Sequence, residues 1–281
     1  MQVIRSIKEM QQMAKELHRE GNRIGYVPTM GFLHEGHLTL INEAKKNNDK
    51  VVISIFVNPL QFGPNEDFDA YPRDIVRDEN LAQNADVDII FYPEVGEMYP
   101  VELSTTISVN KRVNVLCGKS REGHFDGVAT VLMKLFNIIM PDRAYFGLKD
   151  AQQVAVVDGL INDYNIPVEL VAVGTVREED GLAKSSRNVY LTEQERSVAP
   201  ELYRSLQKAV QRILDGEKNL DQVKTEVINA VHEKTSGIID YVEIYSYPDL
   251  LELNEPNGKM IIALAVKFSK ARLIDNITFS I

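Results

Sequence analysis

Two histidines, His34 and His37, follow an apolar run that is closed by Pro28 and Gly31. Proline and glycine at this point predict that a strand ends and the chain turns. A helical pattern begins at Leu38. A strand, a glycine-containing turn and a helix start bring backbone N–H groups to one place, where an anion can bind. Two imidazoles there can donate hydrogen bonds to phosphate oxygens. The first hypothesis is therefore nucleotide chemistry.

The same two histidines have other interpretations. Histidines three residues apart can form a zinc pair on one helical face, but no third ligand lies at metal-like spacing. Either side chain could also be an ordinary packed or solvated residue. The stretch alone leaves these alternatives open.

A second cluster, Lys184, Ser185, Ser186 and Arg187, places two cations and two hydroxyl groups side by side. Such groups can hold a polyphosphate and stabilise the charge that develops when pyrophosphate leaves. On its own, a charged segment of this kind is more often a solvated linker.

A third stretch, from Phe146 to Gln153, joins a predicted strand end to a helix start. Lys149 can offer a point charge to a phosphate or carboxylate. Asp150 can hold a ribose hydroxyl, or it can simply cap the helix. Gln153 lies one turn further along the same helical face as Lys149.

Neutral amides follow another predicted strand, at Asn58 and Gln61. Amides both donate and accept hydrogen bonds, so they suit a hydroxyl or a carboxylate. A capped Asn-Pro turn is the alternative interpretation.

Residues 121–127 combine the basic residue Arg121 with His124 and two glycines. This composition fits either a mobile flap over a ligand or a polar loop.

Composition limits the class of protein. The chain has 281 residues, 44% hydrophobic and 26% charged, as expected of a globular protein. Its net charge of −10 makes general binding to nucleic acid through a basic surface improbable. No apolar run is long enough for a membrane span, and the N-terminus lacks a signal-peptide core. The single cysteine, Cys117, excludes an internal disulfide. These features predict a cytoplasmic enzyme.

Strands and helices alternate through the first part of the chain. The predicted strands cover residues 23–27, 50–57, 87–92, 143–146 and 168–173, and the predicted helices cover 6–20, 38–47, 74–84, 126–139 and 150–164. This order predicts an α/β fold, a Rossmann-like doubly wound parallel sheet. Ligands of such sheets bind beyond the carboxyl ends of the strands, where the motifs fall.

The pattern changes after Asp180. Two predicted helices, 193–214 and 219–235, precede predicted strands at 239–245, 260–268 and 274–281. This order predicts a smaller α+β domain. We expect a catalytic domain at 1–175 and a C-terminal lid domain at 176–281 that begins with the Lys-Ser-Ser-Arg loop.

Together the motifs resemble the nucleotidyl-transferase superfamily, and within it the pantothenate synthetases (pantoate–β-alanine ligases). The resemblance rests on five segments in the same order: 28–37, 56–63, 145–150, 180–188 and 267–275. It runs from about residue 2 to the C-terminus. The resemblance implies an AMP-forming acid–amine ligase of pantothenate and coenzyme A biosynthesis. Such an enzyme forms pantoyl adenylate and pyrophosphate from ATP and (R)-pantoate, and β-alanine then releases AMP and pantothenate.

The resemblance also implies roles for residues of this chain. His37 would be the proton donor and His34 would contact the phosphates, with Lys149 and the Ser185–Arg187 segment as further catalytic groups. Gln61 would contact pantoate and β-alanine, and Gln153 would contact pantoate. The implied ATP-binding residues are Met30, Gly31, Phe32, Leu33, His34, Glu35, Gly36, His37, Gly147, Leu148, Lys149, Asp150, Val176, Lys184, Ser185, Ser186 and Arg187.

The family resemblance further implies Mg²⁺ carried on the ATP phosphates, with no metal site in the protein itself, and a cytoplasmic homodimer. Two residues depart from the family pattern. Phe32 stands where a small residue is frequent, and Leu148 where a polar one is common.

Two other functions fit part of the sequence. A different adenylyl transferase on the same scaffold would act on a phosphorylated acceptor, but neutral Gln61 and Gln153 favour a small polar acid. A non-catalytic nucleotide-binding regulator would need no leaving-group loop, and the Lys184–Arg187 cluster is such a loop.

Overall fold

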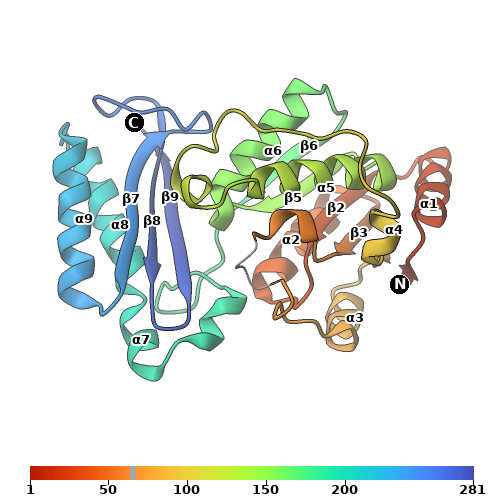
Figure 1. Cartoon of the computed structure of the whole chain (residues 1–281), viewed down its shortest axis with the longest axis horizontal. Helices are drawn as coiled ribbons and strands as arrows, with labels where there is room; N and C mark the ends of the chain where they lie inside the picture. The colour runs from red at the N-terminus through yellow and green to blue at the C-terminus, as the bar shows by residue number, and fades with distance from the viewer. Residues whose placement is uncertain (64–67) are drawn as a thin grey trace. The chain divides into compact units, whose positions relative to one another are not determined.

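The computed structural model describes residues 1–63 and 68–281, which form two compact units (Figure 1). Unit 1 comprises Met1–Asn110, Arg121–Leu148 and Val156–Gly174, without residues 64–67. Unit 2 comprises Lys111–Ser120, Lys149–Ala155 and Thr175–Ile281. Two short segments, 111–120 and 149–155, therefore belong to the same unit as the C-terminal part of the chain. The proposed domain boundary after residue 175 stays a prediction.

Unit 1 is built on a parallel sheet with the strand order β1-β4-β3-β2-β5-β6. The inner strands are almost wholly buried and rich in β-branched residues, as expected when both faces of a parallel sheet are covered. The strands are β1 (Gln2–Ile4), β2 (Ile24–Thr29), β3 (Lys50–Ile55), β4 (Ile89–Phe91), β5 (Arg143–Gly147) and β6 (Glu169–Val173).

Helices cover both faces of this sheet (Figure 1). On one face, Leu40 and Ile41 of α2 (Glu35–Asn47) and Ala82 of α3 (Ile75–Asn84) belong to the same core cluster as Ile53 of β3. On the other, α1 (Ile7–Arg19) contacts α5 (His124–Ile139), whose Phe136 ring meets the Tyr26 ring edge-on. The other helices are α4 (Val95–Met98) and α6 (Ala151–Asp163), and residues 151–155 of α6 belong to unit 2.

The direction of winding reverses between β2 and β5. The chain moves from β2 to β3 on one side of β2, whereas β5 pairs with the other side of β2 and leads outward to β6. Such a reversal opens a crevice at the carboxyl ends of the two strands. The segment that begins at Met30 follows β2, and Leu148 follows β5. Both therefore leave the sheet at its ligand-binding edge.

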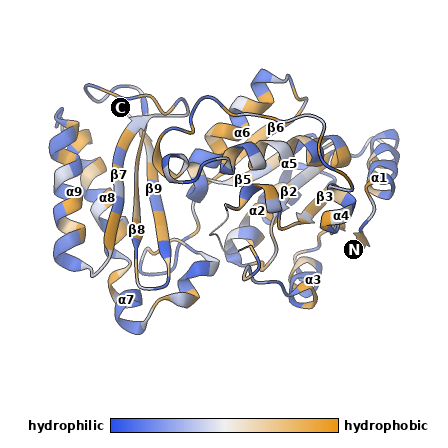
Figure 2. Ribbon diagram, viewed as in Figure 1, coloured by the Kyte–Doolittle hydropathy of each residue, from blue (hydrophilic) through white to orange (hydrophobic). Residues whose placement is uncertain are grey.

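Unit 2 contains an antiparallel sheet with the order β7-β8-β9: β7 (Ile238–Ser246), β8 (Lys259–Lys267) and β9 (Arg272–Ser280). Three helices accompany it: α7 (Glu193–Val198), α8 (Glu201–Leu214) and α9 (Leu220–Lys234). Apolar side chains of α8 and α9, such as Leu206 and Val227, share one core with Ile262 and Leu264 of β8. In Figure 2 the hydrophobic colour is concentrated on β7 and β8, while the visible side of α9 is mostly hydrophilic.

The predicted α/β class, with its smaller α+β part, is confirmed, but two short elements were missed and one predicted helix is divided. The short strand β1 and the one-turn helix α4 were not predicted. The helix predicted over 193–214 is two helices, α7 and α8, because Pro200 at the start of α8 has no N–H to continue the α7 hydrogen-bond ladder. Short 3₁₀ turns occur at η1 (Pro59–Gln61), η2 (Leu116–Ser120), η3 (Leu148–Asp150) and η4 (Ser186–Tyr190).

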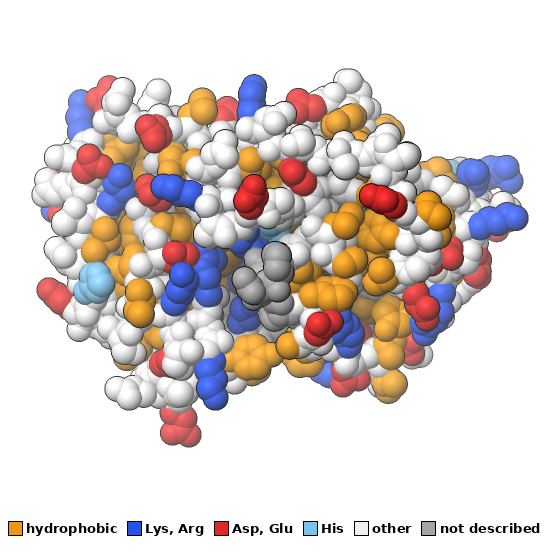
Figure 3. Space-filling model, viewed as in Figure 1, with side chains coloured by type: hydrophobic (Ala, Val, Ile, Leu, Met, Phe, Trp, Pro, Cys, Tyr) orange, Lys and Arg blue, Asp and Glu red, His pale blue; other side chains and the backbone are white. Residues whose placement is uncertain are grey.

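Acidic and basic side chains are interspersed over most of the face that Figure 3 shows. In the described ranges, no helix combines the length and apolar character that crossing a membrane requires.

Glu195 supplies a stability prediction with a definite pH window. Its buried carboxylate accepts hydrogen bonds from Ser269 N at 2.8 Å and Thr192 N at 2.9 Å, and these donors lower the pKa of Glu195 to about 2. A lowered folded-state pKa stabilises the protein above the unfolded-state value and loses that contribution as pH falls toward the folded-state value. The stability advantage of the wild type over Glu195→Gln should be constant near neutral pH. It should shrink between about pH 4.5 and 2 in urea unfolding curves. A pH-independent difference would contradict the assignment.

Candidate active site

The two histidines form the N-terminal cap of α2. His34 Nδ1 accepts a hydrogen bond from Gly36 N at 3.1 Å, and His37 Nδ1 accepts one from His34 N at 3.2 Å. Their ring centroids lie 4.1 Å apart. A neutral imidazole that accepts at Nδ1 carries its proton on Nε2. The cap therefore fixes both rings in the tautomer that donates from Nε2, beside the positive end of a helix.

The turn before this cap is held by Asp78 of α3. Its carboxylate accepts hydrogen bonds from Phe32 N and Leu33 N, both at 2.7 Å, and the residue is 1% exposed. Burial raises the pKa of Asp78, while the two N–H donors act in the opposite direction. Asp78 was missed in the sequence. The available signal was the position of this carboxylate on the predicted helix. Asp78 lies four residues before Ala82, which is buried, and therefore on the apolar face of the helix.

Two residues of this turn have left-handed backbone conformations. Gly31 has φ +84°, and a Cβ there would lie 3.0 Å from both Asp78 Oδ2 and a methyl carbon of Ile55. Phe32 has φ +51°, and the Arg77 guanidinium lies 4.7 Å from the centre of its ring. The bulky residue at position 32 is therefore accommodated by stacking with α3.

A cavity of about 200 Å³ opens at the carboxyl ends of β3 and β4. Met30 and Gly31 of the turn contribute to its wall, and so does Asp78. Arg5 and Arg73 bring cationic side chains to it, although the Arg73 guanidinium donates to the carbonyls of Phe68 and Tyr71.

Gln61 lies at the end of η1, and its amide Nε2 contacts Met30 Sδ at 3.1 Å. Its backbone is fixed by the segment 121–127. His124 Nδ1 donates to Gln61 O at 2.8 Å, and Arg121 Nη1 donates to His124 Nε2 at 2.9 Å. The loop or flap expected at 121–127 thus orients Gln61 in this structure.

Asn58 has a structural role. It is buried, its Nδ2 donates to Gly127 O at 3.0 Å, and its Oδ1 accepts from Tyr99 OH at 2.9 Å. It also caps η1 through Leu60 N. The capped-turn interpretation therefore holds for Asn58.

In unit 2, Lys149 and Asp150 lead through η3 into α6, where Gln153 lies in the first turn. Lys149 Nζ is 3.6 Å from the Asp150 carboxylate. The Lys149 carbonyl oxygen accepts a hydrogen bond from Asn276 Nδ2 at 2.9 Å.

The loop at 176–188, also in unit 2, is folded back on itself. Lys184 N donates to Val176 O at 2.9 Å, and Arg177 pairs with Ala183 in an antiparallel bridge. Lys184 Nζ lies 2.7 Å from the Glu178 carboxylate. Ser185 caps η4 by accepting from Arg187 N at 3.3 Å, so Ser186 and Arg187 stand in the first turn of η4.

The expected site residues divide between the two units. Unit 1 holds the whole 30–37 segment, together with Gln61, Gly147 and Leu148. The Met30 and Gln61 side chains touch within it. Unit 2 holds Lys149, Asp150, Gln153, Val176 and the Lys184–Arg187 cluster. Across residues 1–63 and 68–281, no group of three or more His, Cys, Asp or Glu side chains is placed to hold a metal ion.

A six-stranded parallel sheet with a histidine-capped helix at its switch point, together with a small antiparallel unit, defines a Rossmann-like α/β protein. Its residues 2–278 match the family model described as pantoate–β-alanine ligase. The chain belongs to this family.

Curated relatives and solved structures agree with this assignment. The chain is 62% identical to the pantothenate synthetase of Bacillus cytotoxicus over 281 residues, which cover 100% of both chains. The Bacillus subtilis enzyme is also 62% identical, with 98% of its length covered. The crystal structure of pantothenate synthetase from Thermus thermophilus superposes with a TM-score of 0.92 at 44% identity, covering 99% of each chain.

A structure of pantoate–β-alanine ligase from Francisella tularensis was determined with a β,γ-ATP ligand and β-alanine. It superposes with a TM-score of 0.79 at 34% identity, covering 99% of this chain and 97% of the other.

Proposed function

We propose that this enzyme condenses (R)-pantoate with β-alanine at the expense of ATP, through a pantoyl-adenylate intermediate. The observation that carries the proposal is the family match over residues 2–278, with 62% identity to a pantothenate synthetase along the whole chain. A pantoate carboxylate oxygen attacks the α-phosphorus of ATP, and the bond to the β-phosphate oxygen breaks to release pyrophosphate. The amine of β-alanine then attacks the acyl carbon, loses a proton, and displaces AMP.

Neither step needs a covalent intermediate on the protein. The pantoate carboxylate is already ionised at neutral pH and is the nucleophile of the first step. Catalysis then rests on holding the reactants in line and stabilising the charge that moves onto the leaving oxygens. Histidine, lysine, arginine and amide side chains supply those interactions.

In this proposal the His37 Nε2–H faces the reacting phosphate, and His34 contacts the phosphates from the same cap. Lys149 and the Lys184–Arg187 cluster bind the pyrophosphate that leaves. Gln61 binds pantoate and β-alanine, and Gln153 binds pantoate. The backbone and side chains of 30–37, 147–150 and Val176 complete the ATP-binding set.

ATP enters as its Mg²⁺ complex, because Mg²⁺ in such reactions is bound largely by phosphates and water. We further propose that the enzyme is a cytoplasmic homodimer, as its family resemblance implies.

Gln153 provides a test of the substrate assignment. Gln153→Ala should weaken pantoate binding by about tenfold, as expected for the loss of hydrogen bonds to a charged group, and leave ATP affinity within about twofold of wild type. Isothermal titration with each ligand separately measures both quantities. An equal loss of affinity for pantoate and for ATP would contradict the assignment of Gln153 to the pantoate site.

The proposed reaction is tested by incubating the enzyme with ATP, Mg²⁺, pantoate and β-alanine and quantifying products by mass spectrometry. Pantothenate and AMP should appear in equal amounts, and omitting pantoate should abolish both. Turnover of a phosphorylated acceptor in place of pantoate would assign the chain to another adenylyl transferase. ATP binding without turnover of any acceptor would assign it to a regulator.

A further inference from the structure

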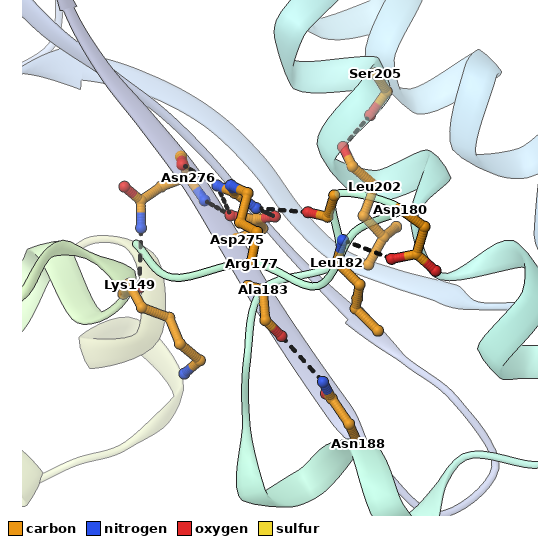
Figure 4. Close-up of polar contacts among 11 residues, drawn as sticks. Lys149, Arg177, Asp180, Leu182, Ala183, Asn188, Leu202, Ser205, Asp275 and Asn276 are labelled. Atoms are coloured by element: carbon orange, nitrogen blue, oxygen red, sulfur yellow. Dashed lines mark hydrogen bonds and ion pairs between the residues drawn. The ribbon is translucent and has the colours of Figure 1, made fainter. Parts of the chain in front are cut away.

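Two adjacent residues of β9, Asp275 and Asn276, each bind a different segment of the proposed ATP site (Figure 4). Asp275 binds Arg177, 98 residues away in sequence, and Asn276 binds Lys149, 127 residues away. Both β9 side chains are almost fully buried, with exposures of 3% and 8%. All of these residues belong to unit 2.

The bond to Arg177 is bidentate. Arg177 Nη1 and Nη2 donate to the two Asp275 oxygens at 2.7 and 2.9 Å, a geometry that fixes the guanidinium plane. Nη1 also donates to Gly181 O at 3.1 Å, and the guanidinium lies 3.4 Å from the centre of the Tyr203 ring. Arg177 therefore cannot swing toward a phosphate without leaving a buried carboxylate unpaired.

Fixing Arg177 also fixes the loop that carries the leaving-group cluster. Arg177 bridges to Ala183, the residue directly before Lys184. The carbonyl of Val176 accepts from Lys184 N at 2.9 Å. The backbone on which Lys184 and the following Ser185 stand is thus tied to β9 through one ion pair.

The bond from Asn276 acts on the other segment. Its Nδ2 donates to the carbonyl of Lys149 at 2.9 Å, at the point where η3 passes into α6. This bond fixes the orientation of the Lys149 carbonyl group. The direction in which the Lys149 side chain leaves the backbone is fixed with it. Strand β9 itself is paired with β8 from Arg272 to Ser280 and is a rigid base for both bonds.

We propose that Asp275 and Asn276 are positioning residues for the adenylation step. They hold Lys149 and the Lys184–Arg187 cluster at one fixed spacing, so that both meet the phosphates that leave as pyrophosphate. This inference rests on the proposed function, and it gives a role to the C-terminal motif 267–275, which has no place among the substrate-binding residues.

The test separates the two half-reactions. Pantoate-dependent exchange of labelled pyrophosphate into ATP reports adenylation, and release of AMP from preformed pantoyl adenylate by β-alanine reports aminolysis.

Asn276→Ala and the nearly isosteric Asn276→Asp each remove the hydrogen-bond donor to the Lys149 carbonyl, and Asp275→Asn weakens the ion pair with Arg177. Since small misplacements of catalytic groups cost about tenfold or more, exchange kcat/KM for ATP should fall by at least that factor in each variant. Aminolysis, in which no pyrophosphate leaves, should stay within about twofold.

Glu217→Gln is the matched control, because it removes an exposed ion pair with Arg212 elsewhere in unit 2. It should leave both half-reactions unchanged. Exchange at the wild-type level in either Asn276 variant would overturn the proposal, as would parallel loss of both half-reactions in variants whose thermal unfolding matches wild type. Absence of exchange in the wild type would instead overturn the proposed function itself.

Discussion

Replacing His37 with alanine should slow adenylate formation by about 10²-fold or more, the range for loss of a donor that acts in the transition state. The α2 cap fixes the His37 Nδ1 as an acceptor for His34 N, which leaves the proton on Nε2. Alanine removes that donor. Initial rates of pyrophosphate exchange at saturating ATP and pantoate measure the effect.

The same change also removes a helix-capping bond, so its effect on stability needs a control. Loss of a cap costs about 1 kcal/mol. Asn219 caps α9 by accepting from Gln222 N at 3.0 Å, and Asn219→Ala removes a comparable bond away from the proposed site. The Asn219→Ala variant should have a lower melting temperature than wild type but the same rate of pyrophosphate exchange. Near-normal exchange in His37→Ala would remove His37 from the mechanism.

Replacing Gly127 with alanine should raise the KM for pantoate by about tenfold or more, because small displacements of substrate-binding groups are costly. A Cβ on Gly127 would lie 2.2 Å from the Leu60 carbonyl oxygen and 2.7 Å from Gln61 N. The η1 turn must therefore shift and carry Gln61 with it. Forcing a methyl group into such a contact also costs about 1–3 kcal/mol of stability.

Gly96→Ala serves as the matched change in unit 1, since a Cβ there meets no atom of the described residues within 4 Å apart from its own helix backbone. Steady-state kinetics and denaturant unfolding of the two variants are compared side by side. Gly96→Ala should resemble wild type in both. If Gly127→Ala kept wild-type pantoate kinetics, the proposed role of the η1 turn would be contradicted.

The fold was largely predictable because its inner strands are continuous apolar runs that alternate with amphipathic helices. The runs at 50–57 and 87–92 contain β3 and β4, although β4 is shorter than predicted. Strand β1 was missed because it has three residues, too few for an alternation of apolar and polar side chains to be recognised. Its parallel pairing with β4, from Gln2↔Ile89 onward, is a long-range contact that local sequence does not encode.

The proposed site residues stand in local motifs, and these were visible in the sequence. The residues that hold them were not. Asp78 binds the turn at Phe32 from 46 residues away, and Asp275 binds Arg177 from 98 residues away. In sequence, Asp78 is an ordinary charged residue of a predicted helix, and Asp275 is the end of the 267–275 segment with no partner assigned to it. Only the packing of distant elements reveals its partner.

We propose that the enzyme makes pantoyl adenylate before any amine reacts. Incorporation of labelled pyrophosphate into ATP, measured with Mg²⁺ and pantoate but without β-alanine, tests it most directly. We expect exchange that depends strictly on pantoate, followed by release of AMP and pantothenate when β-alanine is added. Pantothenate formation in the complete mixture without any amine-independent exchange would contradict the adenylate route.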